Sequence, residues 1–329
     1  METLEGAELC FPQLLNTSCR KPIRPHSEAT TIFILLSSIS LLTVALNLLV
    51  IISISHYRQL HTPTNLLLLS LAVSDFLVGL LLPGQILFFR GCWLLGDFMC
   101  GFFFCVAFIN TSASIGNMVL ISVDRYMAIC DPLCYPTKVT LRRIKICVCL
   151  CWTCSAFYNS VILKDFVRQP GRYNSCYGEC VVVINYITGA VDLILTFIGP
   201  ITVIIVLYMR VFVVAVSQAR AMRSHIVSVT LQPSGTGTAK KSELKAARTL
   251  GVVVAVFLLC FCPYYYPALT GQDTENSSSS SAFLVWLLYC NSSLNPVIYA
   301  FFYPWFRKSI KLIVTLQILQ PDSCGTKLL

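Results

Sequence analysis

Two aspartates stand inside otherwise apolar stretches of the sequence, where a carboxylate is costly to keep. Asp192 lies in the run YITGAVDLILTFIGP, from Tyr186 to Pro200, and Asp75 lies in SLAVSDFLVG. An ionised Asp at the centre of a membrane helix costs about 2.5–3.5 kcal/mol on insertion scales, so such a residue is retained for a function. If the surrounding runs span a membrane, these two carboxylates are where the chain can do chemistry.

Asp192 shares one face of an expected helix with small and polar residues. Thr188, Asp192, Thr196 and Gly199 follow at intervals of four, four and three residues, the spacing at which one helical face recurs. Such a face points into a bundle and away from lipid. Counted from Tyr186, Asp192 lies about six residues, or roughly 9 Å, below the end of the segment, so a solute arriving at that end can reach it.

A carboxylate at this depth suits an organic cation. An ammonium ion is bound well by charge pairing with a carboxylate together with contacts to aromatic faces. Later apolar segments place aromatic residues at similar depths: Phe261, Tyr264, Tyr265, Trp286 and Tyr289. The alternative is structural, because Asp192 can also accept hydrogen bonds from hydroxyls such as those of Thr188 or Thr196 and so hold helices together.

Asp75 has a different set of expected neighbours, all of them amides or hydroxyls. If a bundle brings the segments together, these are Asn47, Ser114, Asn291 and Asn295. A carboxylate surrounded by oxygen ligands can hold a small cation such as Na+. It can also form a hydrogen-bonded cluster that fixes helix packing, and both interpretations are compatible.

The composition indicates that these carboxylates belong to a membrane protein. The chain has 329 residues, of which 56% are hydrophobic and only 12% charged, whereas soluble domains have about 25% charged residues. A large soluble fold would lack its polar surface. Seven apolar segments are long enough to span a bilayer, which takes about 20 residues. They lie near 31–55, 65–89, 98–123, 145–163, 186–214, 246–268 and 282–303.

The predicted fold is therefore an all-α bundle of seven transmembrane helices over residues 31–304, with a tail at 1–30 and a further segment at 305–329. Residues 1–24 are polar, so no cleaved signal peptide is expected. Seven of the 24 Lys and Arg residues fall on the side of the N-terminal tail, and the other 17 on the opposite side. Cytoplasmic loops carry the excess of basic residues, so the N-terminus is expected outside and the C-terminus inside. This bias also explains the net charge of +9 without nucleic acid as a partner.

Cysteines and sequons agree with this orientation. Spacing alone leaves the pairing open for six cysteines on the outer, oxidising side, where disulfides are expected: Cys10, Cys19, Cys92, Cys100, Cys176 and Cys180. The stretch CYGEC lacks the second ligand pair of a zinc site, so no metal site is predicted there. Asn16 and Asn276 stand in sequons on the outer side and are expected to carry glycans.

Two other classes of membrane protein are disfavoured. Transporters usually contain inverted repeats and paired broken helices, and neither is visible here. A membrane enzyme needs an acid–base pair or a metal site within its spans. The four histidines stand outside the spans or at their edges: His26, His56, His61 and His225. The chain is therefore not expected to be an enzyme.

The motifs resemble those of a known family. Seven spans carrying Asn47, Asp75, DRY at 124–126, Trp152, Pro200, FCP at 261–263 and NPVIY at 295–299 resemble a rhodopsin-like G-protein-coupled receptor. Within that superfamily, the stretches VDRYMAICDPLCYPTKVT and NSSLNPVIYAFFYPWFRKSIKLIV resemble the trace amine-associated receptors.

The resemblance implies roles by position. Disulfides Cys100–Cys180 and Cys19–Cys176 are expected, and Arg125 is expected to pair with Asp124 and with Glu243 in the resting state. Residues 305–314 have an amphipathic period typical of a helix lying along the inner membrane face, and Cys324 downstream is a candidate for acylation. The remaining switch and connector positions implied by the family are Ile115, Tyr126, Pro200, Tyr208, Phe257, Asn295, Pro296 and Tyr299.

The implied ligand is a small amine, but its carboxylate has an unusual place. Amine receptors usually carry an Asp on the third span at the position of Ala107, and some trace amine receptors carry it on the fifth span, at the position of Asp192. The third span is expected to contribute Phe108 and Thr111. One deep acid favours a monoamine over a diamine, although Glu179 in an outer loop is a candidate for a second, shallower contact. Phe261 replaces the usual Trp of the family.

By resemblance, the chain is expected to be an amine receptor of the plasma membrane, surrounded by lipid and coupled to a stimulatory G protein that raises cyclic AMP. Similar receptors are mostly olfactory sensors. No resident cofactor is expected apart from Na+ at the Asp75 cluster. The rival interpretation is a receptor of the same fold for a ligand without a cation, with Asp192 purely structural.

Overall fold

The computed structural model describes residues 8–21, 26–89, 91–169, 171–228, 249, 251–266, 278–321 and 323–328. These residues are mostly helical, and among them β pairing is limited to two isolated bridges. The helices are α1 (His26–His56), η1 (Arg58–Leu60), α2 (Pro63–Phe89), α3 (Gly96–Cys130), α4 (Tyr135–Lys138), α5 (Leu141–Ile162), α6 (Lys164–Arg168), α7 (Tyr186–Asp192), η2 (Leu193–Ile198), α8 (Gly199–Ser228), a helix over Gly251–Tyr266, α10 (Ser278–Phe302), α11 (Pro304–Val314), η4 (Gln317–Leu319) and η5 (Ser323–Gly325).

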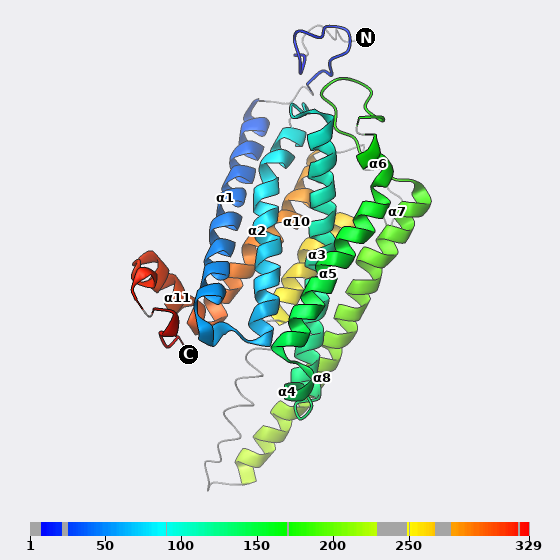
Figure 1. Ribbon diagram of the computed structural model, residues 1–329. Helices are drawn as coiled ribbons and strands as arrows, with labels where there is room; N and C mark the ends of the chain where they lie inside the picture. Colours follow the sequence, from blue (N-terminus) through cyan, green and yellow to red (C-terminus); the bar gives the residue numbers. More distant parts are fainter. Residues whose placement is uncertain are drawn as a thin grey trace.

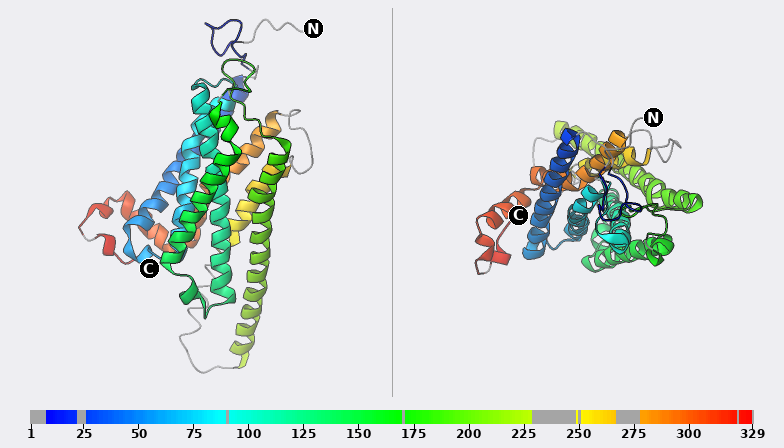
Figure 2. Two further views of the ribbon diagram at one scale, coloured as in Figure 1. Left: turned by 45° about the vertical axis from the view of Figure 1, so that its right-hand side comes forward. Right: turned by 90° about the horizontal axis from the view of Figure 1, so that it is seen from above.

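The long helices form one bundle, as Figures 1 and 2 show. The described helices include one within or across each of the seven apolar segments, and the predicted all-α membrane fold is confirmed. In the described residues, α1, α2, α3, α5 and the continuous run Tyr186–Ser217 are long and apolar enough to cross a membrane. Lipid offers no partner for backbone N–H and C=O groups, which is why such runs fold as helices.

A π-helical turn, η2, joins α7 and α8 directly after Asp192. It ends at Ile198, two residues before Pro200, whose ring removes an N–H donor and crowds the preceding turn. A π turn holds more residues than an α turn, so the spacing assumed for the polar stripe fails beyond Asp192. Thr188, Asp192 and Thr196 are half-buried, whereas Gly199 is exposed and does not share their face.

Three disulfides hold the N-terminal tail and loops over one end of the bundle: Cys10–Cys92, Cys19–Cys176 and Cys100–Cys180. Two of them join the pairs implied by the family resemblance, and Cys10–Cys92 is an addition. Backbone bonds reinforce the tail, because Cys19 N donates to Tyr177 O (2.9 Å) and Tyr177 N donates to Thr17 O (2.7 Å). The tail therefore lies fixed across this end, which we call the tail end (Figure 1).

The other end of the bundle carries α11, and the chain folds back beyond it (Figure 2). Residues 305–314 do form the predicted amphipathic helix, with Trp305 and Phe306 buried and Ser309 Oγ donating to Ser53 Oγ on α1 (2.6 Å). The last residues then return to η1, a packing that the sequence did not predict. Gln59 bonds to Thr326 O through Nε2 and accepts from Leu328 N through Oε1 (3.2 Å).

We expect Leu328→Asp to release this returning segment. Leu328 is 1% exposed, and full burial of a leucine contributes about 1.5–3 kcal/mol. The variant should therefore be cleaved more readily by a protease within residues 323–328 while the bundle stays intact. Leu319→Asp is the matched control, since Leu319 is 78% exposed and should leave cleavage unchanged. Equal cleavage of wild type and Leu328→Asp would contradict the docked arrangement.

Candidate functional site

The Asp192 carboxylate lies at the end of α7, half-buried and bonded to a neighbouring helix. Asn185 caps α7 by accepting from Ile187 N (3.1 Å), which sets where the helix starts and how deep Asp192 lies. Asp192 Oδ1 accepts a hydrogen bond from the hydroxyl of Tyr158 on α5 (3.0 Å). Within the described residues, no basic side chain forms an ion pair with Asp192. The carboxylate is thus held by a neutral donor.

Two of the threonine hydroxyls predicted for this site donate to backbone carbonyls of their own helical segments. Thr196 Oγ1 donates to the backbone carbonyl of Asp192 (2.7 Å), and Thr188 is half-buried one turn before it. On α3, Thr111 Oγ1 donates to Ala107 O (2.9 Å), so this hydroxyl also bonds its own helix. Serine and threonine commonly make such i−4 bonds in apolar helices.

Aromatic side chains from the helix 251–266 stand beside the Asp192 segment. Phe197 of η2 is buried and stacks on Tyr265, with ring centroids 4.0 Å apart and planes 18° apart. Tyr264 meets Tyr265 edge-on at 5.2 Å. Since η2 follows Asp192 directly, this aromatic pair is anchored on the turn next to the carboxylate. Deeper on the same helix, Phe261 packs on Phe257 at 4.3 Å.

Two aromatic residues predicted for the ligand site, Trp286 and Tyr289, have contacts with α1 and α2. Trp286 stacks on Phe283 at 5.7 Å, and Tyr289 donates to Gln85 Oε1 of α2 (3.2 Å). Both pack against a cluster from α1 and α2 that contains Leu36, Leu82 and Ile86. These contacts join α10 to α1 and α2, and within the described residues no hydrogen bond links Trp286 or Tyr289 to Asp192. Phe108, the remaining aromatic candidate, is half-buried on α3.

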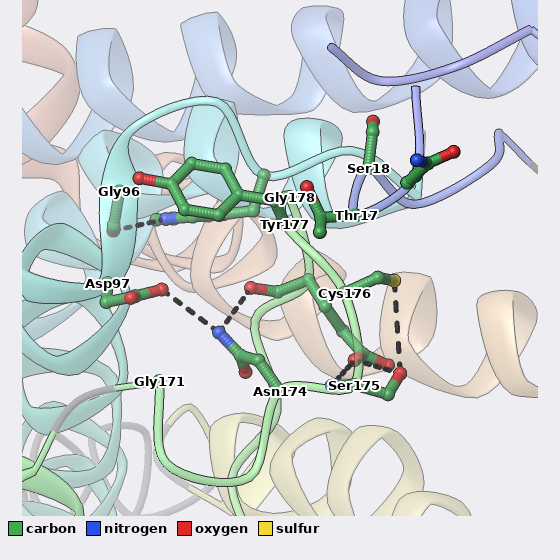
Figure 3. Close-up of a pocket in the computed structure, with 13 residues that line it drawn as sticks. Thr17, Ser18, Gly96, Asp97, Gly171, Asn174, Ser175, Cys176, Tyr177 and Gly178 are labelled. Carbon is green, nitrogen blue, oxygen red and sulfur yellow. Dashed lines mark hydrogen bonds between the residues drawn. The ribbon is translucent and has the colours of Figure 1, made fainter. Parts of the chain in front are cut away.

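Glu179 lines a separate cavity at the tail end, of about 360 Å³, shown in Figure 3. Its carboxylate accepts from Ser175 N (2.6 Å) and Ser175 Oγ (2.7 Å), and these bonds lower the pKa of Glu179 below its ordinary value. Asn174, which also lines the cavity, donates to Asp97 Oδ1 (3.0 Å) and to Glu179 O (2.9 Å). Asp192 does not line this cavity.

Of the two predicted glycosylation sites, one lies in the described part of the chain. Asn16 is exposed and lines the same tail-end cavity. Asn276 lies outside the described residues.

Around Asp75, hydrogen bonds join α10 to α2 and α1 to α10. Asn295 Nδ2 donates to Asp75 Oδ2 (2.8 Å), and Asn47 Nδ2 donates to the carbonyls of Thr43 and Ser292 (2.9 Å each). All of the predicted members are buried: Asn47, Asp75, Ser114, Asn291 and Asn295.

Several acceptor oxygens in this cluster lack a partner within the described residues: Asp75 Oδ1, Asn47 Oδ1, Asn291 Oδ1 and Asn295 Oδ1. Buried polar atoms are normally hydrogen-bonded, so an excess of buried acceptors calls for a donor or a cation. Carboxylate and amide oxygens are the ligands that small hard cations take. The residues present therefore fit a cation such as Na+.

A second charged cluster lies near the α11 end, around the DRY sequence, which is inside α3 rather than after it. Arg125 is buried and pairs with Asp124, with Nε 3.0 Å from Oδ2. Thr64 of α2 accepts from Arg125 Nη2 (2.6 Å) and donates to Asp124 Oδ2 (3.0 Å). Tyr135 of α4 donates to Asp124 Oδ1 (2.8 Å). Burial is the main cause that raises the pKa of Tyr135, and the nearby Asp124 raises it further. Glu243, the other predicted partner of Arg125, lies outside the described residues.

The other predicted switch positions belong to more than one part of the bundle. Ile115, Phe257 and Tyr299 belong to one buried core cluster, against which Tyr208 packs. Tyr126 packs instead on Ile129 and Val211. The α10 helix continues through Asn295 and Pro296, and Pro200 follows the π turn.

Sequence reasoning missed four side chains that the structure places in these sites: Tyr158, Gln85, Thr64 and Tyr135. A tyrosine near the end of an apolar helix is typical of the membrane interface, which hid the role of Tyr158. Thr64 and Tyr135 stand at the starts of α2 and α4, and the sequence carried no signal that these helix ends meet Asp124.

Comparison with known proteins places this architecture. Residues 46–299 match the family described as 7 transmembrane receptor (rhodopsin family). Trace amine-associated receptor 13c of Danio rerio is 38% identical over 98% of this chain and 97% of its own. Trace amine-associated receptor 9 of Rattus norvegicus is 38% identical over 98% and 97%, and trace amine-associated receptor 1 of Mus musculus is 36% identical over 96% and 98%.

Proposed function

Since this chain belongs to the rhodopsin family of seven-transmembrane receptors and, within it, to the trace amine-associated receptors, we propose that it binds a small amine through Asp192. It is a multi-pass membrane protein and a receptor, not an enzyme. Receptors of this class pass their signal to heterotrimeric G proteins, and the trace amine family senses amines.

One observation carries the assignment of the amine site. Asp192 is a half-buried carboxylate without an ion-pair partner in the described residues, and the turn that follows it carries Phe197, which stacks on Tyr265. An ammonium ion would supply the missing counter-charge and contact aromatic faces at the same time. Ala107 offers no charge on α3, so the cation would bind on the α7 side of the site.

A monoamine fits this site better than a diamine. A diamine would need a second free carboxylate at the right distance. Glu179 is bonded to Ser175 and lines the tail-end cavity, which Asp192 does not line. The second, shallower contact for Glu179 is therefore not supported by its position.

Amine binding would act on Arg125 by shifting the population of two arrangements of the bundle. The amine favours the active arrangement only by its difference in affinity for the two states. The connection runs through the core cluster that contains Phe257 and Ile115, below Phe261. In the active arrangement Arg125 leaves its cluster, and the α11 end opens to a G protein. We propose that this G protein is of the stimulatory class. We also propose that the N-terminus of the receptor lies outside the plasma membrane and that the receptor serves olfaction.

The Arg125 cluster should restrain basal activity, so we expect Tyr135→Phe to raise it. The lost hydroxyl donates to the ionised Asp124, and a hydrogen bond to a charged group contributes about 1.5–3 kcal/mol. Only the part of this energy that differs between the two states shifts their population, so cyclic AMP without ligand should rise about two- to fivefold. Tyr186→Phe, which removes the hydroxyl of a residue that is 88% exposed, is the control. Basal output equal to that of wild type would show that this bond persists in both states.

The test of the proposed function is cyclic AMP output in cells that express the chain, across a panel of monoamines and diamines. A rival function exists, because the Tyr158–Asp192 bond also suits a structural role. Under that rival, a ligand without a cation would activate the receptor, and no amine in the panel would depend on Asp192.

A further inference from the structure

Tyr158 stands on a helix that is held tightly by its neighbours. One residue further along α5, Asn159 is buried and its Nδ2 donates to Ser112 Oγ on α3 (2.9 Å). Two turns earlier, Trp152 Nε1 donates to Ser70 Oγ on α2 (3.0 Å). These bonds fix both the height and the rotation of α5. The Tyr158 hydroxyl is therefore presented from a rigid support.

Asp192 stands on a less regular support. It is the last residue of α7, and the π turn of η2 follows at once. A π turn adjusts its hydrogen-bond register more easily than an α-helix, and such turns are often found at functional sites. A side chain at this junction needs an external contact to keep one orientation. The described contact of this kind is the 3.0 Å bond from Tyr158 to Oδ1.

We propose that Tyr158 is a positioning residue for the amine: its hydroxyl holds Oδ1 of Asp192 so that the rest of the carboxylate faces the ammonium group of the ligand. This inference rests on the proposed function of Asp192. An ionised carboxylate can accept about four hydrogen bonds, so the bond from Tyr158 leaves capacity for an ammonium N–H. A neutral donor also stabilises the charge without competing for it as a basic residue would. A carboxylate already oriented loses less freedom when the ligand binds.

Tyr158→Phe should raise the EC50 of the activating amine about tenfold. This factor corresponds to the lower end of the range for loss of a hydrogen bond to a charged group. The maximal response and the amount of receptor at the surface should stay as in wild type. Tyr186→Phe removes a tyrosine hydroxyl from α7 that is almost fully exposed, and it should leave the EC50 unchanged. A lower EC50 for Tyr158→Phe would overturn the proposal, because it would mean that Tyr158 competes with the amine.

A double-mutant cycle separates positioning from packing. Asp192→Glu keeps the charge but moves the carboxylate by one methylene, so it can no longer meet the Tyr158 hydroxyl in the same way. In this background Tyr158→Phe should shift the EC50 less than about twofold, because the effects of substitutions at two interacting residues are not additive. Equal shifts in both backgrounds would assign Tyr158 to helix packing and overturn positioning.

The failure of this inference can be told apart from the failure of the proposed function. If Asp192→Asn loses the amine response and Tyr158→Phe matches wild type, only the role of Tyr158 falls. If Asp192→Asn reaches the surface and responds as wild type does, the amine does not bind Asp192, and both proposals fall together.

Discussion

Replacement of Asp192 by Asn is expected to remove the amine response. Loss of one partner from a desolvated charge pair costs about 2–5 kcal/mol, which corresponds to a roughly thirty- to several-thousand-fold rise in EC50. The side chains are nearly the same size, and the amide can still accept from Tyr158 at 3.0 Å. The helices should therefore keep their packing while the counter-charge for the ammonium is lost. The measurement is a cyclic AMP dose–response curve together with surface expression.

Two further variants test whether loss of the amine response is specific to the Asp192 carboxylate. Asp97→Asn removes another carboxylate, one that lines the tail-end cavity, and it should leave the EC50 of a monoamine unchanged. Glu179→Gln tests the same cavity with diamines. If Asp192→Asn is at the surface with an EC50 within about threefold of wild type, the amine assignment is wrong and Asp192 serves only to join α7 to α5 through Tyr158.

Depth along the membrane was predictable from the sequence, but rotation about each helix was not. The apolar runs gave the position of Asp192 within its segment and of Tyr264 and Tyr265 at a similar level. Trp286 and Tyr289 stand at comparable depth, and their packing on α1 and α2 was not predicted. Hydropathy carries little information on rotation when a helix is apolar on most sides, as these are.

Local departures from the α-helix were a second feature that could not be predicted from the sequence. The stripe from Thr188 to Gly199 assumed one helical period, and the π turn before Pro200 changes that period. The presence of proline indicates a disturbance of the helix, but not whether it becomes a kink or a π turn. The polar cluster around Asp75 could be predicted more fully, because each of its buried amides and hydroxyls had to find polar partners in an apolar bundle.

Contacts between distant segments were the hardest to foresee. Cys10 and Cys92 had no assigned partners, since spacing does not determine disulfide pairing. The bond between Tyr158 and Asp192 joins helices whose facing sides depend on the whole bundle. The return of Leu328 to η1 depends on a turn after α11 that no strong turn motif marks.

We expect Na+ to weaken activation by the amine, and we expect this effect of Na+ to vanish in Asp75→Asn. A cation held by the Asp75 cluster would link α1, α2 and α10 and stabilise the arrangement described here. If that arrangement is the resting one, Na+ opposes activation. The EC50 of the amine should then be about fivefold or more higher in NaCl than in KCl, a typical coupling between two sites. The assay is G-protein nucleotide exchange in isolated membranes. KCl is the suitable replacement salt, because organic cations such as choline carry ammonium groups that could bind Asp192.

Asp75→Asn removes the charge that attracts the cation and can still accept from Asn295 at Oδ1, so its EC50 should be the same in both salts. Asp97→Asn, with its carboxylate at the tail end, should keep the sodium effect of wild type. The pattern across the two variants is what identifies the site, since a general effect of Na+ on membranes or on the G protein would appear in both. If wild type responds equally in NaCl and KCl, the unpaired oxygens around Asp75 are satisfied by water, and the cluster acts only to fix helix packing.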